Sequence, residues 1–243
     1  MLIREKIPFV RGCLLMASFL ALFALLLTPL FGDSEGRRLT GLQYADNIFN
    51  ELSKGSSYFI PGVREQVRSV EGKEVSLTVT MKKADLAPLA LTLLRTAGVT
   101  DVAADGGKLS FTGNLGGILA SATDDADNLY HNRAEPVSQK YGGEPPLKAA
   151  AAWWHLLSPA IKELQKQGLI SEAQVVDQVI RRAVEPGNNF YSVPAARVTD
   201  HVWLMSGMLI FYVLYTLWYG FAIFELFEGV GLAMTKSASK QES

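Results

Sequence analysis

Two long apolar runs stand near the ends of this chain, and most of its polar residues lie between them. Residues 13–31 and 202–224 contain no charged side chain. Each run is about 20 residues long, which is enough for a helix to cross the roughly 30 Å hydrocarbon core of a bilayer. The pattern therefore predicts two transmembrane helices, which we place at 13–31 and 201–227.

The next segment, residues 32–135, alternates between helical and extended patterns. Thr40 and Gln43 form a capping box, the signature of a helix N-terminus, and apolar residues then recur at helical spacing as far as Gly55. Residues 56–62 are rich in serine, proline and glycine, so we expect a turn with buried aromatic side chains there.

Strand patterns follow this first helix. Residues 75–81 alternate between apolar and polar side chains, and 99–104 with 108–112 match a hairpin closed by a glycine-rich turn. We expect a helix capped by Asp85 between them and a second helix that ends near Asn132. This β-α-β-β-α order predicts a small lobe with helices on one face of an antiparallel sheet.

The last third of the intervening segment is helical. Glycine and proline residues at 136–146 predict a linker, and 147–200 carries helical periodicity. We expect the helix to restart at Pro159, a further capped helix from Ser171, and its end near Pro186. The predicted fold class is α+β, with two transmembrane helices bracketing an extracytoplasmic domain made of the lobe and this helical segment.

Basic residues flank the outer ends of the two apolar runs, three before the first and two after the second. The positive-inside rule then places segments 1–12 and 228–243 in the cytoplasm and residues 33–200 in the periplasm or outside the cell. We expect the bacterial inner (plasma) membrane. The first run exceeds the 7–15 residues of a signal-peptide apolar region and lacks an A-x-A-like site, so we expect an uncleaved anchor.

Composition excludes several classes of function. The formal net charge is −1, so the chain has no basic footprint for nucleic acid. Its single cysteine, Cys13, leaves no internal disulfide, iron–sulfur cluster or CxxCH haem attachment. No cofactor is expected. About 170 residues between the runs are enough for one single-core domain or two small ones.

One helical face carries side chains of the kind that bind metals. Asp124, Asp127, Asn128 and His131 share this face, and the i,i+4 spacing brings Asp127 and His131 together. Two ligands do not make a metal site, and the sequence shows no second pair. We therefore favour the interpretation of a solvated helix face.

Trp153, Trp154 and His155 form the densest aromatic group between the runs. On a helix the two tryptophans point about 100° apart, so one can be core while the other meets a membrane, a partner or a ligand. Packing of both in the core is the interpretation we favour.

The second apolar run is unusually aromatic. Tyr212 and Tyr215 lie too deep for the aromatic belt at a membrane surface, and tyrosine hydroxyls at that depth need hydrogen-bond partners. We therefore predict an interface with the helix of another protein, formed by Tyr212, Tyr215, Trp218, Tyr219 and Gly220. The alternative is a lipid-facing anchor with a thick aromatic belt.

Two acids, Glu225 and Glu228, follow the second run at i,i+3 spacing. We expect them at the inner membrane boundary, beside Arg4, Lys6 and Arg11, and paired with these bases or with basic groups of a partner subunit. A role in ion conduction is the alternative, since acids at membrane depth are functional candidates.

These patterns favour a non-catalytic accessory or scaffold subunit of an inner-membrane complex, with the lipid bilayer and other integral membrane subunits as partners. The cytoplasmic segments are too short for an output domain, and two helices do not enclose a transport path. The alternatives are a membrane-anchored ligand-binding or envelope-signalling module acting through the second helix, and an anchored periplasmic enzyme.

Overall fold

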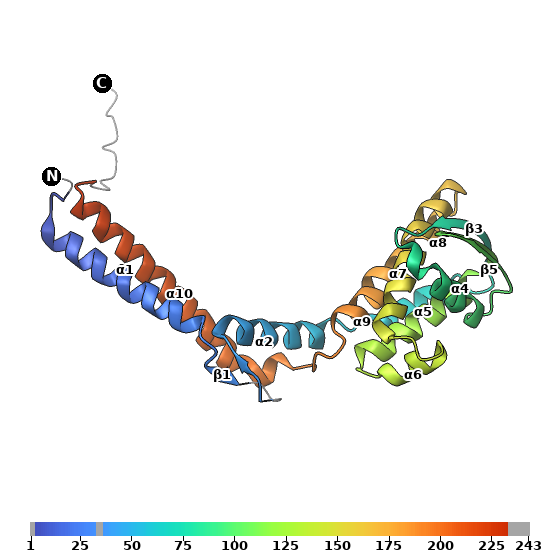
Figure 1. The fold of residues 1–243 in the computed structure, drawn as a ribbon, viewed down its shortest axis with the longest axis horizontal. Helices are drawn as coiled ribbons and strands as arrows, with labels where there is room; N and C mark the ends of the chain where they lie inside the picture. Colours follow the sequence, from blue (N-terminus) through green and yellow to red (C-terminus); the bar gives the residue numbers. More distant parts are fainter. Residues whose placement is uncertain (1–2, 33–35, 233–243) are drawn as a thin grey trace, which may run out of the picture. The chain divides into compact units, whose positions relative to one another are not determined.

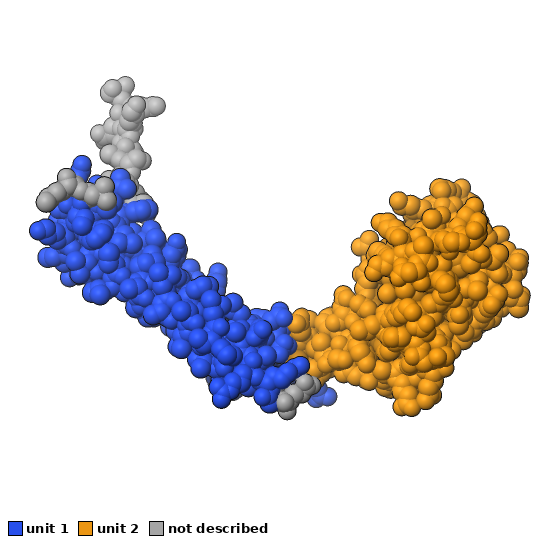
Figure 2. Space-filling model, in the orientation of Figure 1, with its two compact units in different colours: residues 1–49, 197–243 blue, residues 50–196 orange. Residues whose placement is uncertain are grey.

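The computed structural model describes residues 3–32 and 36–232 and shows a mixed α+β chain that is mostly helical (Figure 1). The chain divides into two compact units (Figure 2). Unit 1 comprises residues 1–49 and 197–243, and unit 2 comprises residues 50–196. Unit 1 therefore contains the chain up to the middle of the first helix after the apolar run, which the sequence pattern had placed in the lobe.

Each unit has its own set of elements. Unit 1 contains α1 (Lys6–Leu26), β1 (Phe31–Gly32), β2 (Arg38–Leu39), the start of α2 (Gly41–Ser56) and α10 (Val198–Gly229). Unit 2 contains the end of α2, α3 (Ile60–Arg68), β3 (Glu74–Thr80), the 3-10 turn η1 (Ala84–Leu86), α4 (Ala87–Thr96), β4 (Asp101–Asp105), β5 (Lys108–Asn114), α5 (Leu115–Tyr130), α6 (Ala134–Lys140), α7 (Pro146–Lys166), α8 (Ile170–Val179), the π-helical turn η2 (Ile180–Val184) and α9 (Glu185–Asn189).

The helices α1 and α10 of unit 1 pack against each other as an antiparallel pair (Figure 1). Both are long and apolar enough to cross a membrane, which confirms that part of the prediction. The boundaries differ from those expected: α1 begins at Lys6 and ends at Leu26, and the chain leaves it just before Thr28-Pro29, where proline disfavours helical backbone in the preceding residue.

The expected capping box at the start of α2 is present. The Thr40 backbone N–H donates to Gln43 Oε1 at 3.0 Å, and the Gln43 backbone N–H donates to Thr40 Oγ1 at 3.2 Å. These two reciprocal bonds satisfy donors that the first turn of a helix otherwise leaves free. The helix ends at Ser56, one residue beyond the glycine that was expected to stop it.

The sheet of unit 2 has strand order β3-β5-β4, with both pairs antiparallel. The predicted strand and hairpin are both confirmed, with Leu77 opposite Phe111 and Ala103 opposite Ser110. Apolar side chains of β3 face a buried side, against which α7 packs. On the other face Thr78 and Ser110 share a hydrogen bond across the strands.

A single apolar core joins the sheet to the helices that follow it. Val137 and Tyr141, from the segment expected to be a linker, are buried in this core together with Leu77 and Trp153. Segment 136–146 thus contains most of α6 and the turn after it. The sheet lobe and the helical segment share one core instead of packing separately.

Two turns were expected where the structure has helices. Segment 56–62 was expected to bury its aromatics, yet Tyr58 and Phe59 are exposed and Ile60, the first residue of α3, is fully buried. Pro61 occupies the first turn of α3, where its missing N–H has no cost. Near the end of unit 2, Pro186 is the second residue of α9 instead of ending a helix.

Three expected helix starts were also wrong. The helix α7 continues through Pro159, held by a buried stripe that includes Leu156 and Ala160 on either side of the proline. Asp85 lies in η1 and caps no helix. The Ser171 hydroxyl donates to Glu172 Oε2 instead of capping α8, which starts one residue earlier.

Candidate functional site

An apolar groove of about 570 Å³ lies along the pair of helices in unit 1. Leu15 and Leu22 of α1 line it, together with Leu214, Leu217 and Phe221 of α10. The exposed surface of both helices is apolar over most of its length, with Leu214 and Leu217 more than half exposed. Such a surface requires a covering of lipid or of other apolar side chains.

Two aromatic residues at this groove carry polar atoms that lack partners. Tyr215 stacks on Phe19 of α1 with a centroid distance of 4.3 Å. The hydroxyl of Tyr215 and Nε1 of Trp218 are buried, and neither has a hydrogen-bond partner among the described residues. A buried donor without a partner costs roughly 1–3 kcal/mol. The helix pair therefore contains two unsatisfied polar groups, both on residues that line the groove.

The predicted partner-helix residues fall into two groups. Tyr215 and Trp218 line the groove, and both Tyr215 and Tyr219 contact Phe19 of α1, with ring centroids 4.3 Å and 5.1 Å from it. Tyr212 is 64% exposed, and an added Cβ on Gly220 would meet nothing within 4 Å. These last two lie on open surface, so their contact with another protein stays a prediction.

Close approach between α1 and α10 depends on two glycines that sequence reasoning missed. A Cβ added to Gly12 would lie 2.7 Å from the backbone nitrogen of Leu226, and one added to Gly229 would lie 2.6 Å from Cα of Phe9. Small residues that let helix backbones approach are typical of membrane-helix contacts. The less exposed residues of α1, which include Gly12, recur at alternating steps of four and three, the spacing of helices that pack along a seam. The sequence of α1 is apolar on every side, so this seam appears only in the structure.

The acids Glu225 and Glu228 lie near the end of α10 that meets the start of α1. The backbone N–H of Arg4 donates to the Gly229 carbonyl at 2.9 Å, which brings the two chain segments together. In the described part of the chain, neither glutamate forms an ion pair with the nearby bases Arg4, Lys6 and Arg11. The expected charge pairing stays a prediction for a partner subunit.

In unit 2, the candidate metal residue Asp127 is held by ion pairs and hydrogen bonds. Its Oδ2 lies 3.2 Å from Arg64 and 3.6 Å from Arg133, and its Oδ1 accepts a 2.9 Å hydrogen bond from Tyr58. His131 Nδ1 lies 3.2 Å from the same carboxylate. Among the residues described, no group of three or more His, Cys, Asp or Glu is arranged to hold a metal ion. This helix face was expected to be solvated, but two of its acids, Asp124 and Asp127, form ion pairs with Arg64 of α3.

A buried carboxylate, Asp125, is the polar centre of the core. It is 2% exposed and accepts hydrogen bonds from Trp153 Nε1 at 2.8 Å, from Lys140 Nζ at 2.7 Å and from the hydroxyl of Tyr141. Burial and the charge of Asp125 both raise the pKa of Tyr141. Because it lies on α5 and accepts from Lys140 and Tyr141 at the end of α6 and from Trp153 of α7, this carboxylate ties α5, α6 and α7 together.

Lys54 forms a second polar centre, near the two ends of unit 2. The residue is 3% exposed, and its Nζ donates to Asn132 Oδ1 at 3.0 Å, to the Phe190 carbonyl at 2.9 Å and to the Val193 carbonyl at 2.5 Å. Burial lowers the pKa of Lys54. The ammonium group joins the end of α2 to the segment after α9, so it fastens the two places where the chain enters and leaves unit 2.

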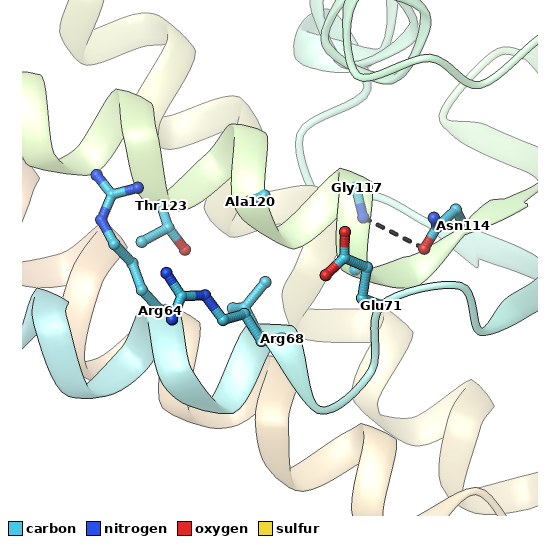
Figure 3. A pocket seen from close by; sticks show the side chains of 9 residues that line it. Arg64, Arg68, Glu71, Asn114, Gly117, Ala120 and Thr123 are labelled. Atoms are coloured by element: carbon cyan, nitrogen blue, oxygen red, sulfur yellow. Dashed lines mark hydrogen bonds between the residues drawn. The ribbon is translucent and has the colours of Figure 1, made fainter.

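One pocket of unit 2, of about 270 Å³, lies between α3 and α5 (Figure 3). The side chains of Arg64 and Arg68 extend from α3 toward it, and Glu71 follows them. Asn114 caps α5 by accepting from the backbone N–H of Gly117 at 3.3 Å. Both arginines already pair with acids, Arg64 with two aspartates and Arg68 with a glutamate. With Glu71, these acids outnumber the two arginines, so the pocket has no positive excess to attract an anion.

A second pocket of unit 2, of about 320 Å³, lies between α7 and the η2–α9 segment. Trp154 and His155 line one wall, and Glu185, Asn188 and Asn189 line the other. Packing of both tryptophans in the core was the favoured interpretation, and the structure bears it out for Trp153 only. Trp153 is a buried core residue, whereas Trp154 reaches this pocket at the edge of the core.

Comparisons of the chain with family models, with curated proteins and with solved structures give no match.

Proposed function

We propose that this chain is a non-catalytic accessory or scaffold subunit of a bacterial inner-membrane complex. The helices α1 and α10 anchor it, both termini lie in the cytoplasm, and residues 33–200 lie in the periplasm or outside the cell. The length and apolar surface of the two helices support the membrane location, and the Lys/Arg bias of the sequence supports the orientation.

The observation that carries the proposal is the pair of buried, unsatisfied polar groups on two residues that line the apolar groove. An anchor complete in itself needs only lipid around it, and lipid tails offer no hydrogen-bond acceptor to Tyr215 or Trp218. A transmembrane helix of another protein supplies both apolar side chains for the groove and acceptors for these two groups after small side-chain adjustments. We therefore take such a helix as the occupant.

The charged end of the helix pair supports the same partner. Glu225 and Glu228 have no basic partner in the described part of the chain, and Glu228 is exposed. Basic groups of a neighbouring subunit at the membrane boundary would pair with them, each pair contributing about 1 kcal/mol or less. Replacing both acids with Gln is then expected to weaken the assembly modestly.

Purification of the tagged full chain in a mild detergent tests the proposal. We expect another integral membrane protein to co-purify at a fixed ratio. Leu217→Trp, which fills the groove, should reduce its recovery several-fold, whereas Val213→Trp, on exposed surface outside the groove lining, should not. Recovery of the chain alone, or equal loss with both variants, would contradict the proposal.

A further inference from the structure

The pocket between α7 and the η2–α9 segment has the shape of a small-molecule site. On the α7 side, two small residues, Ala150 and Ala151, line the pocket together with Trp154. On the other side Val184 and Glu185 form the wall where η2 passes into α9. Its volume of about 320 Å³ falls at the lower end of the roughly 300–1,000 Å³ typical of small-ligand sites.

The backbone on one side of this pocket departs from regular helix. The segment Ile180–Val184 makes a π-helical turn inside an otherwise α-helical stretch. Such turns are rare and occur frequently at functional sites. Here the turn directly precedes Glu185 and its neighbours, so it sets the position of the polar wall.

Several polar groups on this wall retain unused hydrogen-bonding capacity. Trp154 Nε1 donates to Glu185 Oε1 at 2.9 Å, and no described residue donates to the other oxygen of this carboxylate. Asn188 Nδ2 donates to Asn189 Oδ1 at 3.2 Å, which leaves Oδ1 of the first amide and Nδ2 of the second available. The wall therefore offers both donors and acceptors within one small space.

His155 adds a further donor and acceptor. Its ring meets Trp154 edge-on at 5.0 Å. Burial, with a smaller contribution from the positive charge of Lys83, lowers the pKa of His155 and so favours the neutral ring. Among the residues that line the pocket, Glu185 is the one acid, and no lysine or arginine is present.

These features select one chemical class of ligand. A lining with one carboxylate and no cation disfavours phosphates and carboxylates. Amides and a carboxylate beside a half-buried indole and two alanine methyls match a molecule with many hydroxyl groups and apolar C–H faces. From this juxtaposition of Trp154, Glu185, Asn188 and Asn189 we infer that the pocket binds a neutral saccharide of one or two rings. This inference concerns unit 2 alone and does not rest on the proposed assembly.

Saturation-transfer NMR on the full chain tests the inference. The protein is held in lipid nanodiscs, since sugar-based detergents would themselves compete for the pocket. The probes are glucose, maltose, N-acetylglucosamine and its β-1,4-linked dimer. We expect saturation transfer to at least one of them, with a change in tryptophan fluorescence over the same concentration range, because Trp154 lines the pocket.

Matched variants separate this pocket from non-specific binding. Ala151→Leu fills the pocket and should weaken binding by about tenfold or more, a loss of roughly 1.4 kcal/mol. Ala120→Leu fills the pocket between α3 and α5 instead, and should leave binding unchanged within about twofold. Asn188→Ala with Asn189→Ala, at exposed positions, provides a second test that does not disturb the core.

Two results would overturn the inference. One is the absence of saturation transfer to every probe in a protein whose near-ultraviolet circular dichroism shows it to be folded. The other is binding that Ala151→Leu and the double asparagine variant leave unchanged.

Discussion

Gly12 of α1 lies so close to α10 that a Cβ atom placed on it would come within 2.7 Å of the backbone nitrogen of Leu226. The same Cβ would lie 2.8 Å from Cγ of Leu226 and 3.1 Å from the carbonyl oxygen of Ala222. Two of these three atoms belong to the backbone, so a rotamer change of one side chain cannot relieve the contact. The spacing of the two helices therefore depends on the missing side chain of Gly12.

Gly12→Ala is accordingly expected to separate the two helices and to destabilise their pairing by about 1–3 kcal/mol. The measurement is the thermal unfolding of the full chain in detergent, followed by circular dichroism. Gly220→Ala is the matched control, because that position on α10 has nothing within 4 Å of an added Cβ. Equal unfolding temperatures for the two variants would show that the helices do not pack through Gly12.

The sequence predicts those elements of this fold that have a strong local signal. The strand at 74–80 alternates without interruption, and the box formed by Thr40 and Gln43 marks its helix by hydrogen bonds only three residues apart. Local signals failed where tertiary burial decides the outcome. Nothing in the neighbourhood of Pro159 indicates that buried residues on both sides keep α7 continuous.

No local sequence pattern predicts the polar centres of unit 2, because their partners come from distant segments of the chain. Lys54 bonds to Asn132, 78 positions away, and to carbonyls more than 130 positions away. Trp154 could be assigned to several environments from its spacing, and only the position of Glu185 beside it shows that it borders a pocket. Sites formed by long-range contacts need the fold before their residues can be grouped.

The orientation of the chain leads to a prediction with fused reporters. A reporter inserted at Gly142, in the turn after α6, should behave as exported, and one fused after the C-terminal residue should behave as cytoplasmic. Gly142 suits an insertion because its φ of +68° and the open space around it place it in an exposed turn. A cytoplasmic signal from the insertion at Gly142 would reverse the proposed topology.

Replacing Asp125 tests the buried polar centre of unit 2. Asp125→Ala leaves the indole N–H of Trp153 and the hydroxyl of Tyr141 buried without an acceptor, and should cost about 3–5 kcal/mol of unfolding free energy. Asp124→Ala removes the neighbouring carboxylate, whose pair with Arg64 is half exposed, and should cost about 1 kcal/mol or less. Urea unfolding of a fragment spanning residues 50–196, which has its own core, measures both. Similar losses for the two variants would refute a buried role for Asp125.

Removing the ammonium group of Lys54 should loosen the two chain ends of unit 2. Lys54→Met leaves the carbonyls of Phe190 and Val193 and the Asn132 side chain without their donor, an expected loss of about 1–3 kcal/mol. In this variant the amide hydrogen-exchange rate of the segment after α9 should increase more than that of the sheet. Unchanged exchange in this segment would show that other contacts hold it.

The lowered pKa of Lys54 also sets the sign of a pH effect. Between the folded pKa and the ordinary lysine value of about 10.4, the unfolded chain binds a proton that the folded chain does not, so unfolding free energy rises with pH in that window. The stability of the unsubstituted protein relative to Lys54→Met should therefore increase as the pH approaches 10. A decrease in this relative stability would mean that Lys54 binds its proton more tightly in the folded chain than in the unfolded chain.

The most direct measurement of the proposed assembly is site-specific photo-cross-linking in intact cells, with the photoreactive residue placed at either Leu214 or Val213. These adjacent residues of α10 are both exposed, at 60% and 47%, but only Leu214 lines the apolar groove. The proposal predicts that the probe at Leu214 is joined to one discrete integral membrane protein and that the probe at Val213 gives little or none of this product. Cross-links to lipid alone at both positions, or equal protein products from both, would contradict a partner helix in the groove.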